Sequence, residues 1–315
     1  MKPASITRVL AAQLLPVRDE RGHKYDFGHV LVIGGSAAFP GAPSLAARGA
    51  LAAGAGLVTL CVPASVADIV LSRSPAETMR IALPDRGTGA MEPLAVETTV
   101  NLILERRVTT LCIGCGMGRS AETRDYVNGL LSAVYADGSR LAETLYTVLD
   151  ADGCTALDLR TADIPALRHQ RHRVVLTPHL GEYERLTGKP RASFSHRLAA
   201  EAADFGRDHH VTLVLKSATT VVSDGTQTFA LDAPNSALAK GGSGDVLAGI
   251  IAGLAFPCDV GSRVPHRFGT LLQASLLGVW LHARAAYHGR RRRTAFSLLP
   301  SELPTFLPDV FREIL

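Results

Sequence analysis

The chain has 315 residues, of which 47% are hydrophobic and 20% are charged, and its formal net charge is +4. This composition allows a substantial hydrophobic core and excludes an intrinsically disordered chain. The length permits one large α/β domain or two smaller ones. The net charge is too small to indicate a nucleic-acid-binding protein by itself.

Five cysteines are scattered along the chain, and Cys112 and Cys115 form a CxxC motif. Since no second pair and no histidine pair lies near them in the sequence, we interpret both as structural thiols rather than zinc or redox ligands. The odd cysteine count favours a reducing compartment. The sequence has neither the apolar segment of a signal peptide nor the run of about 18 apolar residues that spans a membrane. We therefore expect a cytoplasmic protein with no membrane contact.

Residues 1–26 are polar without a clear period, and we expect an N-terminal arm or helix there, ahead of one domain over residues 27–315. Short apolar segments then alternate with segments of helical length, which predicts a mostly parallel sheet covered on both faces. The expected strands are His29–Ile33, Leu57–Val62, Thr109–Ile113, Leu145–Leu149, Arg173–Leu176, Thr212–Lys216 and a hairpin of Thr219–Ser223 with Gln227–Leu231. The expected helices are Gly41–Ala55, one opened by Pro63, Ala121–Tyr135, Gly181–Leu186, Ser195–Asp208, one beginning at Asp245, Arg267–His288 and Leu299–Ile314.

Polar or glycine-rich clusters follow strand after strand of this expected sheet. In open α/β sheets, ligands bind beyond the carboxyl ends of the strands, so these clusters are expected to meet at one edge. The clusters are Gly34–Ser36, Gly114–Gly118, Asp150–Asp152, Thr177–Glu182 and Lys216–Thr220.

The glycine-rich segment Asn235–Gly249 reads NSALAKGGSGDVLAG and is the most informative stretch of the chain. Glycine can adopt positive φ, and it lets a ligand approach the backbone closely. The apolar run that follows has helical length, so the segment predicts a helix N-terminus, where free amides and the helix dipole favour an anion. Asp245 in the first turn is either a capping carboxylate or a base beside a phosphate. The motif alone leaves both interpretations open.

Two common nucleotide-binding motifs are absent from the sequence. There is no GxxxxGK[ST] loop, and GCGMG at Gly114–Gly118 lacks the GxGxxG spacing. The sequence therefore supports neither a P-loop enzyme nor a Rossmann dehydrogenase. Lys216 stands at a strand end before a threonine-rich turn. A helix N-terminus, a base such as Asp245 and a lysine form a set suited to phosphoryl transfer.

Two further segments have distinctive compositions. Arg290–Arg293 follows Gly289, and we expect a solvated basic loop with no nucleic-acid partner, because no aromatic residues alternate with the arginines. The expected helix Gly41–Ala55 consists almost wholly of small residues. Such a helix can pack very closely against a sheet or a neighbouring chain.

Several motifs together resemble the ADP-dependent NAD(P)H-hydrate dehydratases, a family of the ribokinase-like superfamily. The resemblance extends from about His23 to near the C-terminus, and the motifs occur in the family's order. They are HVLVIGGSAAFPGAPSLAARGALAAGAGLVTLCVP (His29–Pro63), VLDADG (Val148–Gly153), VLTPHLGEYERL (Val175–Leu186), LVLKSATTVVSDG (Leu213–Gly225) and NSALAKGGSGDVLAG (Asn235–Gly249).

The resemblance implies a three-layer α/β/α fold and a repair reaction. The implied substrates are the (6S) hydrates of NADH and NADPH, known as NADHX and NADPHX. ADP, or ATP, with Mg²⁺ would phosphorylate the hydrate hydroxyl, and loss of phosphate would restore the double bond. An NAD(P)H-hydrate epimerase, expected as a separate protein, would act in the same pathway, and the family implies a homo-oligomer.

The resemblance also implies roles for particular residues. Asp245 would be the catalytic base. The hydrated dinucleotide would be bound by Ala42, Gly116, His179 and Asp245. The nucleotide would be bound by Lys216, Ser217, Ala218, Thr219, Thr220, Gly242, Ser243 and Gly244. Glu182 is a weaker candidate that would hold magnesium through water.

Three positions depart from the family pattern. Cys115 and Leu180 stand where the family usually has proline, and Ser236–Leu238 replaces a PGM-like stretch. None of these departures removes a proposed charged or phosphate-contacting group. Two other functions remain open: a ribokinase-like small-molecule kinase, for instance of a vitamin-precursor alcohol, and a nucleotide sensor without catalysis.

Overall fold

The computed structural model describes residues 3–157, 173–256 and 270–315. The strands are β1 (Ala4–Ser5), β2 (His29–Ile33), β3 (Leu57–Pro63), β4 (Met79–Leu83), β5 (Thr110–Ile113), β6 (Tyr146–Leu149), β7 (Val174–Leu176), β8 (Thr212–Leu215), β9 (Thr219–Ser223) and β10 (Thr228–Asp232). The α-helices are α1 (Arg8–Leu14), α2 (Ala42–Ala52), α3 (Ala67–Leu71), α4 (Val96–Arg106), α5 (Ala121–Val134), α6 (Arg140–Thr144), α7 (Ala151–Ala156), α9 (Leu180–Thr187), α10 (Arg191–Phe194), α11 (Leu198–His209), α12 (Ser243–Leu254), α13 (Thr270–Arg292) and α14 (Leu307–Arg312).

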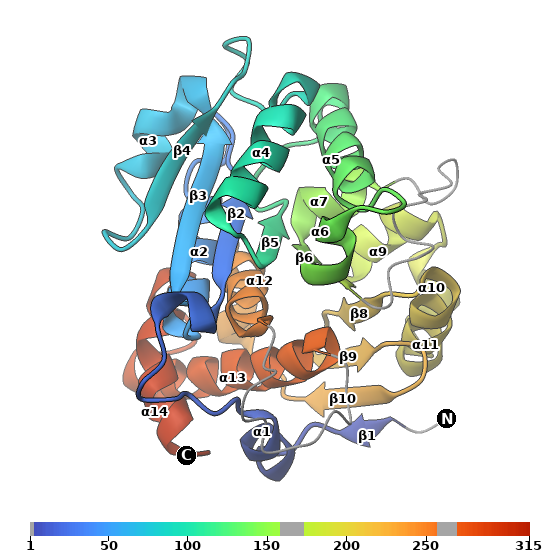
Figure 1. The fold of residues 1–315 in the computed structure, drawn as a ribbon. Coiled ribbons are helices and arrows are strands. Elements are labelled where there is room, and N and C mark those ends of the chain that lie inside the picture. The colour runs from blue at the N-terminus through green and yellow to red at the C-terminus, as the bar shows by residue number, and fades with distance from the viewer. Residues whose placement is uncertain (1–2, 158–172, 257–269) are drawn as a thin grey trace.

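The described strands form one ten-stranded sheet in the order β1-β10-β9-β8-β7-β6-β5-β2-β3-β4. Strand β9 runs antiparallel to both of its neighbours, β8 and β10. The other neighbouring pairs are parallel, including β1 with β10 at the edge of the sheet (Figure 1). The prediction of a mostly parallel sheet with a β9–β10 hairpin is therefore confirmed.

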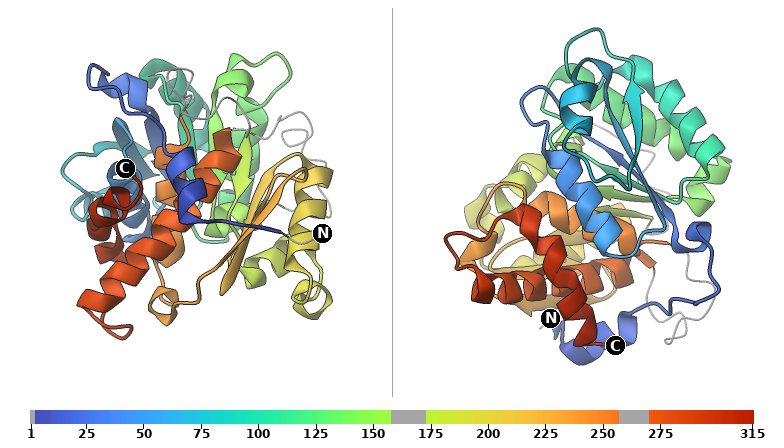
Figure 2. Two further views of the ribbon diagram at one scale, coloured as in Figure 1. Left: turned by 90° about the horizontal axis from the view of Figure 1, so that it is seen from below. Right: turned by 90° about the vertical axis from the view of Figure 1, so that its left-hand side faces the viewer.

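Helices cover both faces of this sheet, as the two views of Figure 2 show. Successive residues of a strand point to opposite faces. In β2, Val30 and Val32 accordingly join the core beneath α2, α12 and α13. Leu31 and Ile33 join the core beneath α4, α5, α9 and α11. The chain thus has the expected three-layer α/β/α architecture.

The small-residue helix α2 packs backbone to backbone against α12. A Cβ atom added at Gly249 would lie 1.9 Å from the carbonyl oxygen of Ala46, and one at Gly253 would lie 2.5 Å from that of Ala50. A Cβ at Gly49 would likewise lie 2.4 Å from the carbonyl oxygen of Val246. The small face of α2 is therefore used inside the chain, where it holds α12 close to the sheet.

Some predicted elements were wrong or incomplete. The run after Gly289 is not a loop, because Arg290–Arg292 form the last turn of α13, where basic side chains complement the helix dipole. The expected beginning of that helix at Arg267 lies outside the described residues. The expected helix Leu299–Ile314 is divided into the 3-10 helix η5 (Pro300–Phe306) and α14, a segment with three prolines.

Other elements were not predicted at all. The edge strands β1 and β4 and the helices α4, α6, α7 and α10 had no counterpart among the expected elements, whereas α3 follows the 3-10 helix η2 (Ala64–Val66) where a helix was expected after Pro63. In the described parts of the chain, no helix combines the length and the hydropathy that crossing a membrane requires.

Candidate active site

A cavity of about 730 Å³ lies at the carboxyl ends of the central strands. Asp150 directly follows β6, His179 follows β7, and Lys216 follows β8, so three neighbouring strands deliver polar side chains to one place. The start of α12 contributes Gly242 and Asp245 to the lining of the cavity. This is the position at which open α/β sheets bind their ligands.

Lys216 and Asp150 form the central ion pair of the cavity wall. The Nζ atom of Lys216 donates to Oδ1 of Asp150 at 2.6 Å, and the hydroxyl of Thr177 donates to the same oxygen at 2.6 Å. Burial alone would lower the pKa of Lys216, but the charges of Asp150 and Glu182 raise it above its ordinary value. Lys216 therefore carries a permanent positive charge at the cavity.

The first turn of α12 presents unpaired amides to this cavity. Gly242 caps the helix with a φ of +98°, and a Cβ there would lie 2.6 Å from a methyl group of Leu45, so a larger residue is excluded. Within the described structure the amides of Gly244 and Asp245 have no hydrogen-bond acceptor. A Cβ at Gly244 would lie 3.0 Å from Nζ of Lys216. Free amides beside an ammonium group form a cradle for phosphate.

Asp245 lines the cavity from the same turn. Burial raises the pKa of its carboxyl from an ordinary 3.8 to about 7, and the negative charge of Asp150 adds to this effect. The nearby Cys115 thiol and the charge of Lys216 act on the pKa of Asp245 in the opposite direction. A carboxylate with a pKa near neutrality is well matched to general base catalysis.

His179 and Glu182 form a reciprocal cap at the start of α9. Nδ1 of His179 accepts hydrogen bonds from the amides of Gly181 and Glu182, at 3.0 and 3.2 Å. The proton of the neutral ring therefore lies on Nε2, which is 3.3 Å from Oε1 of Glu182. Oε2 of Glu182 accepts from the amide of His179 at 2.8 Å. Both side chains line the cavity in fixed orientations.

Two sets of side chains bear on metal binding. Sγ of Cys115 and one carboxylate oxygen each of Asp150 and Asp245 lie within 4.8 Å of one another. This set does not suit Mg²⁺, which prefers oxygen ligands, and Lys216 already neutralises Asp150. Glu182 has carboxylate lone pairs beyond those used in the helix cap, which fits contact with a hydrated cation.

The structure brings most of the predicted site residues together. The predicted residues that line the cavity are His179, Glu182, Lys216, Ser217, Ala218, Thr220, Gly242, Ser243, Gly244 and Asp245. The hydroxyl of Thr219 instead donates to Asp232 at 2.7 Å, outside the cavity lining.

Ala42 and Gly116 also lie outside the lining of this cavity, but they contact each other. A Cβ at Gly116 would lie 2.8 Å from Cβ of Ala42 and 2.8 Å from Cβ of Phe39. Gly116 adjoins Cys115, whose Sγ lies within 4.8 Å of a carboxylate oxygen of Asp245. Gly116 is therefore buried and packed closely against Ala42 and Phe39.

Several cavity residues had been given no role from the sequence. Asp150 appeared only as part of a polar cluster after a strand, and its pairing with Lys216 depends on the strand order. His282 comes from α13, where it lies 3.4 Å from the hydroxyl of Ser243. Burial lowers the pKa of His282 to about 4, so its ring is neutral. A lone histidine in an apolar helix gave no signal for this position.

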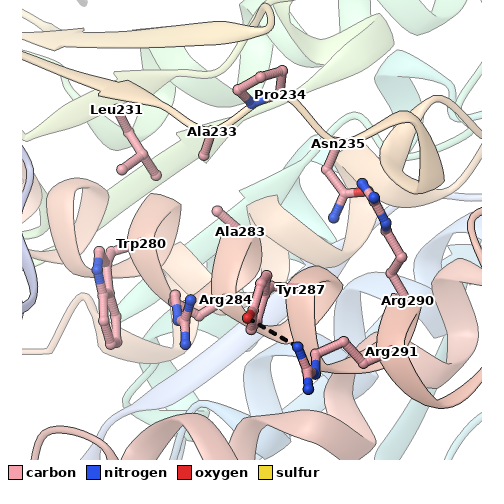
Figure 3. Close-up of a pocket in the computed structure, with 10 residues that line it drawn as sticks. All are labelled: Leu231, Ala233, Pro234, Asn235, Trp280, Ala283, Arg284, Tyr287, Arg290 and Arg291. Carbon is pink, nitrogen blue, oxygen red and sulfur yellow. Dashed lines mark hydrogen bonds between the residues drawn. The ribbon is translucent and has the colours of Figure 1, made fainter.

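A second cavity of about 330 Å³ is lined by residues of β10, of the segment that follows it and of α13 (Figure 3). Ala233, Pro234 and Asn235 line both cavities. Arg290 and Arg291 line the second cavity, and a guanidinium nitrogen of Arg291 lies 3.4 Å from the Tyr287 hydroxyl (Figure 3). The two arginines do not line the main cavity.

The fold and the site define the class to which the chain belongs. A three-layer α/β/α sandwich with a glycine-rich helix start at the carboxyl edge of the sheet is the ribokinase-like fold. The chain belongs to the NAD(P)H-hydrate dehydratase family, which it matches over residues 30–309.

Individual relatives agree with this assignment. The chain is 36% identical to the bifunctional NAD(P)H-hydrate repair enzyme of Moorella thermoacetica. The alignment covers 98% of this chain and 54% of that enzyme. It is also 30% identical to the ADP-dependent (S)-NAD(P)H-hydrate dehydratase of Neisseria meningitidis. That alignment covers 85% of this chain and 79% of the relative. The chain spans about half the length of the bifunctional relatives it matches.

A solved structure agrees with the fold. The ADP/ATP-dependent NAD(P)H-hydrate dehydratase of Bacillus subtilis, co-crystallised with ATP and Mg²⁺, superposes with a TM-score of 0.79. It is 27% identical in sequence, and the match covers 100% of both chains.

Proposed function

We propose that the protein is an ADP-dependent NAD(P)H-hydrate dehydratase, a hydro-lyase that repairs hydrated NADH and NADPH. The observation that carries this proposal is the arrangement at the start of α12. The Asp245 carboxylate, the free amides of Gly244 and Asp245, and the Lys216 ammonium group all face one cavity. Family membership and the nucleotide-dependent relatives support the same activity.

The proposed reaction has two steps. Asp245 takes the proton from the hydroxyl group of the (6S) hydrate, and the hydroxyl oxygen attacks the terminal phosphorus of ADP while the bond to AMP breaks. The adjacent carbon then loses a proton, the carbon–oxygen bond to phosphate breaks, and the ring double bond is restored. Lys216 and the free amides of α12 stabilise negative charge on the transferring group.

The proposed binding roles follow the cavity lining. Lys216–Thr220 and Gly242–Gly244 would hold the nucleotide, and His179 would hold the hydrated dinucleotide together with Ala42 and Gly116. Bound Mg²⁺ would neutralise charge on the nucleotide phosphates. Glu182 would contact the hydration shell of that ion from its fixed position in the α9 cap.

A product analysis tests this proposal. Incubation of NADH hydrate with ADP and Mg²⁺ is expected to yield NADH, AMP and inorganic phosphate in equal amounts, measured by ³¹P NMR and chromatography. A stable phosphate ester without NADH would indicate a small-molecule kinase instead. Tight ADP binding without any product would indicate a nucleotide sensor.

The remaining proposals concern the cellular context. An NAD(P)H-hydrate epimerase acts in the same pathway, in line with the bifunctional names of several relatives. We place the enzyme in the cytoplasm as a homo-oligomer. Light scattering of the purified protein measures the assembly, and a monomeric mass at micromolar concentration would refute the oligomer.

A further inference from the structure

His282 is a buried histidine on α13 that lines the active-site cavity and has no part in the proposed reaction. Its Nε2 atom lies 3.4 Å from the hydroxyl oxygen of Ser243, the first residue of α12, and the two side chains form a hydrogen bond. We propose that His282 is a positioning residue, which donates this hydrogen bond and thereby directs the Ser243 hydroxyl to donate to a phosphate oxygen of the nucleotide. This inference rests on the proposed function and deepens it, since it adds a pair of side chains to the phosphate cradle.

The packing of α13 against α12 determines where His282 lies. A Cβ atom added at Gly278 would lie 2.8 Å from Cγ1 of Ile251, so α13 approaches α12 closely at that position. His282 follows Gly278 by four residues and therefore lies on the same face of α13. The ring is thus held at the beginning of α12 by the packing of two helices.

Ser243 is held in place by its own backbone. Its amide donates to the carbonyl oxygen of Lys240 at 3.2 Å, within the glycine-rich turn that leads into α12. The amide is therefore occupied, and the hydroxyl is the donor that Ser243 can offer to an anion. Gly242 and Gly244, its neighbours in the cavity lining, have no side chain, so the Ser243 hydroxyl is the side-chain donor of this part of the cradle.

The direction of the hydrogen bond follows from the charge state of the ring and the charge of the ligand. Burial lowers the pKa of His282 to about 4, and the positive charge of Lys216 acts in the same direction, so the ring is neutral and has one N–H donor. If the Ser243 hydroxyl donated to the ring, its lone pairs would face the bound phosphate and repel it. If the N–H at Nε2 donates to the Ser243 oxygen, the hydroxyl proton is free to bind the phosphate. A bound nucleotide therefore favours the second arrangement, which supplies a donor without the cost of burying a second positive charge.

A double-mutant cycle tests the coupling between the two side chains. The affinity for ADP with Mg²⁺ is measured by isothermal titration calorimetry on the unaltered protein, His282→Leu, Ser243→Ala and the double variant. We expect each single variant to lower the affinity about three- to tenfold, which corresponds to the loss of one hydrogen bond. The double variant is expected to bind ADP no more weakly than Ser243→Ala, because the ring acts through the hydroxyl. The affinity for NADH hydrate is expected to change less than about twofold in all of them.

Two further variants separate a positioning role from simple packing. His282→Gln retains an N–H donor at a similar distance from the backbone and is expected to bind ADP within about twofold of the unaltered protein. Ser275→Ala removes another fully buried polar side chain from α13 and is expected to leave the affinity for ADP unchanged. If His282→Leu does not fold, His282→Met takes its place in the cycle.

The outcomes separate this inference from the proposed function. Additive losses in the double variant, an affinity of His282→Gln as low as that of His282→Leu, or equal losses for ADP and NADH hydrate would overturn the role of His282, even if the protein forms NADH from its hydrate. Coupled losses in a protein that binds ADP but forms no NADH would support the role of His282 and refute the dehydratase function. A lack of ADP binding by the unaltered protein would refute both.

Discussion

The ammonium group of Lys216 lies 2.6 Å from the carboxylate of Asp150, although the two residues are 66 positions apart in the sequence. They follow β8 and β6, and β7 lies between these strands. Thr177, which follows β7, donates to the same carboxylate oxygen at 2.6 Å. The pair therefore spans three strands and fixes the lysine against the backbone of Gly244.

Removal of the lysine charge is expected to destabilise the protein. Lys216→Met leaves the nearly fully buried Asp150 carboxylate without its counterion, and breaking a buried ion pair costs roughly 3–5 kcal/mol. Chemical denaturation measures the change. The double variant Asp150→Asn/Lys216→Met, which removes both charges, is expected to recover most of the loss. A single variant as stable as the unaltered protein would show that the pair does not contribute.

Lys216 is expected to contribute more to the binding affinity for ADP than to the binding affinity for NADH hydrate. In the stable double variant Asp150→Asn/Lys216→Met, we expect ADP affinity to fall roughly tenfold or more, because a charge-assisted contact to phosphate is lost. The affinity for NADH hydrate is expected to change much less. Isothermal titration calorimetry measures both, and equal losses for the two ligands would contradict a nucleotide-binding role of Lys216.

Asp245→Asn is expected to lower turnover at least a thousandfold. The amide cannot accept the hydroxyl proton, while the cavity shape and the phosphate cradle remain. ADP affinity is expected to stay within about threefold of its original value, since the amides of Gly244 and residue 245 are retained. Kinetics and calorimetry on the same preparation provide the comparison. A variant that keeps most of its turnover would remove Asp245 from the role of base.

The activity is expected to depend on pH through Asp245. Because burial raises the pKa of this carboxyl to about 7 and only the ionised form accepts a proton, kcat/KM is expected to fall as the pH drops below 7. The decrease approaches tenfold per pH unit well below that value. A rate profile that stays flat down to pH 5 would show that the base titrates elsewhere.

Because the pKa of Asp245 is raised in the folded protein, we expect the stability difference between the unaltered protein and Asp245→Asn to depend on pH. Its pKa is higher in the folded than in the unfolded chain, so ionisation opposes folding, and the cost grows as the pH rises from about 4 to 7. At pH 8 the full cost corresponds to roughly 4 kcal/mol. Asp245→Asn is therefore expected to be more stable than the unaltered protein at pH 8, whereas the two converge near pH 4. Denaturation at both pH values checks this, and a constant difference would contradict it.

Because α2 and α12 are in close contact, the stability of the protein is expected to depend strongly on the size of residue 249. Gly249→Ala places a Cβ where only 1.9 Å separates it from the carbonyl oxygen of Ala46, so the helices must move apart. We expect a loss of about 3 kcal/mol in unfolding free energy. Gly41→Ala is the matched control, since a Cβ there meets no atom within 4 Å and φ is −87°. Similar stability of the two variants would refute the close contact.

Much of the sheet could be predicted because its strands are short apolar runs with clear ends. HVLVI at His29–Ile33 is fully buried and matched its predicted bounds. The edge strand Met79–Leu83 was missed because exposed residues alternate with partly buried ones in it. Periodicity predicts a strand best where a whole run is buried.

The parts of the site that could not be predicted depend on contacts distant in sequence. The Lys216–Asp150 pair requires the order β8-β7-β6, which local residue patterns do not encode. The proximity of the Cys115 sulfur to Asp245 requires the positive φ of Gly114 and the position of α12, so the CxxC motif indicated only a buried thiol. The glycine-rich start of α12 was visible in the sequence because its motif and its structure are both local.

Cofactor repair by this cavity can be followed through the absorbance of reduced nicotinamide. Purified protein is mixed with NADH hydrate and Mg²⁺, with and without ADP, while the absorbance band of reduced nicotinamide is followed. We expect the absorbance to rise only when ADP is present, and Asp245→Asn to show no rise. No increase with ADP or ATP, on a sample shown to be folded, would contradict the assignment of this cavity to cofactor repair.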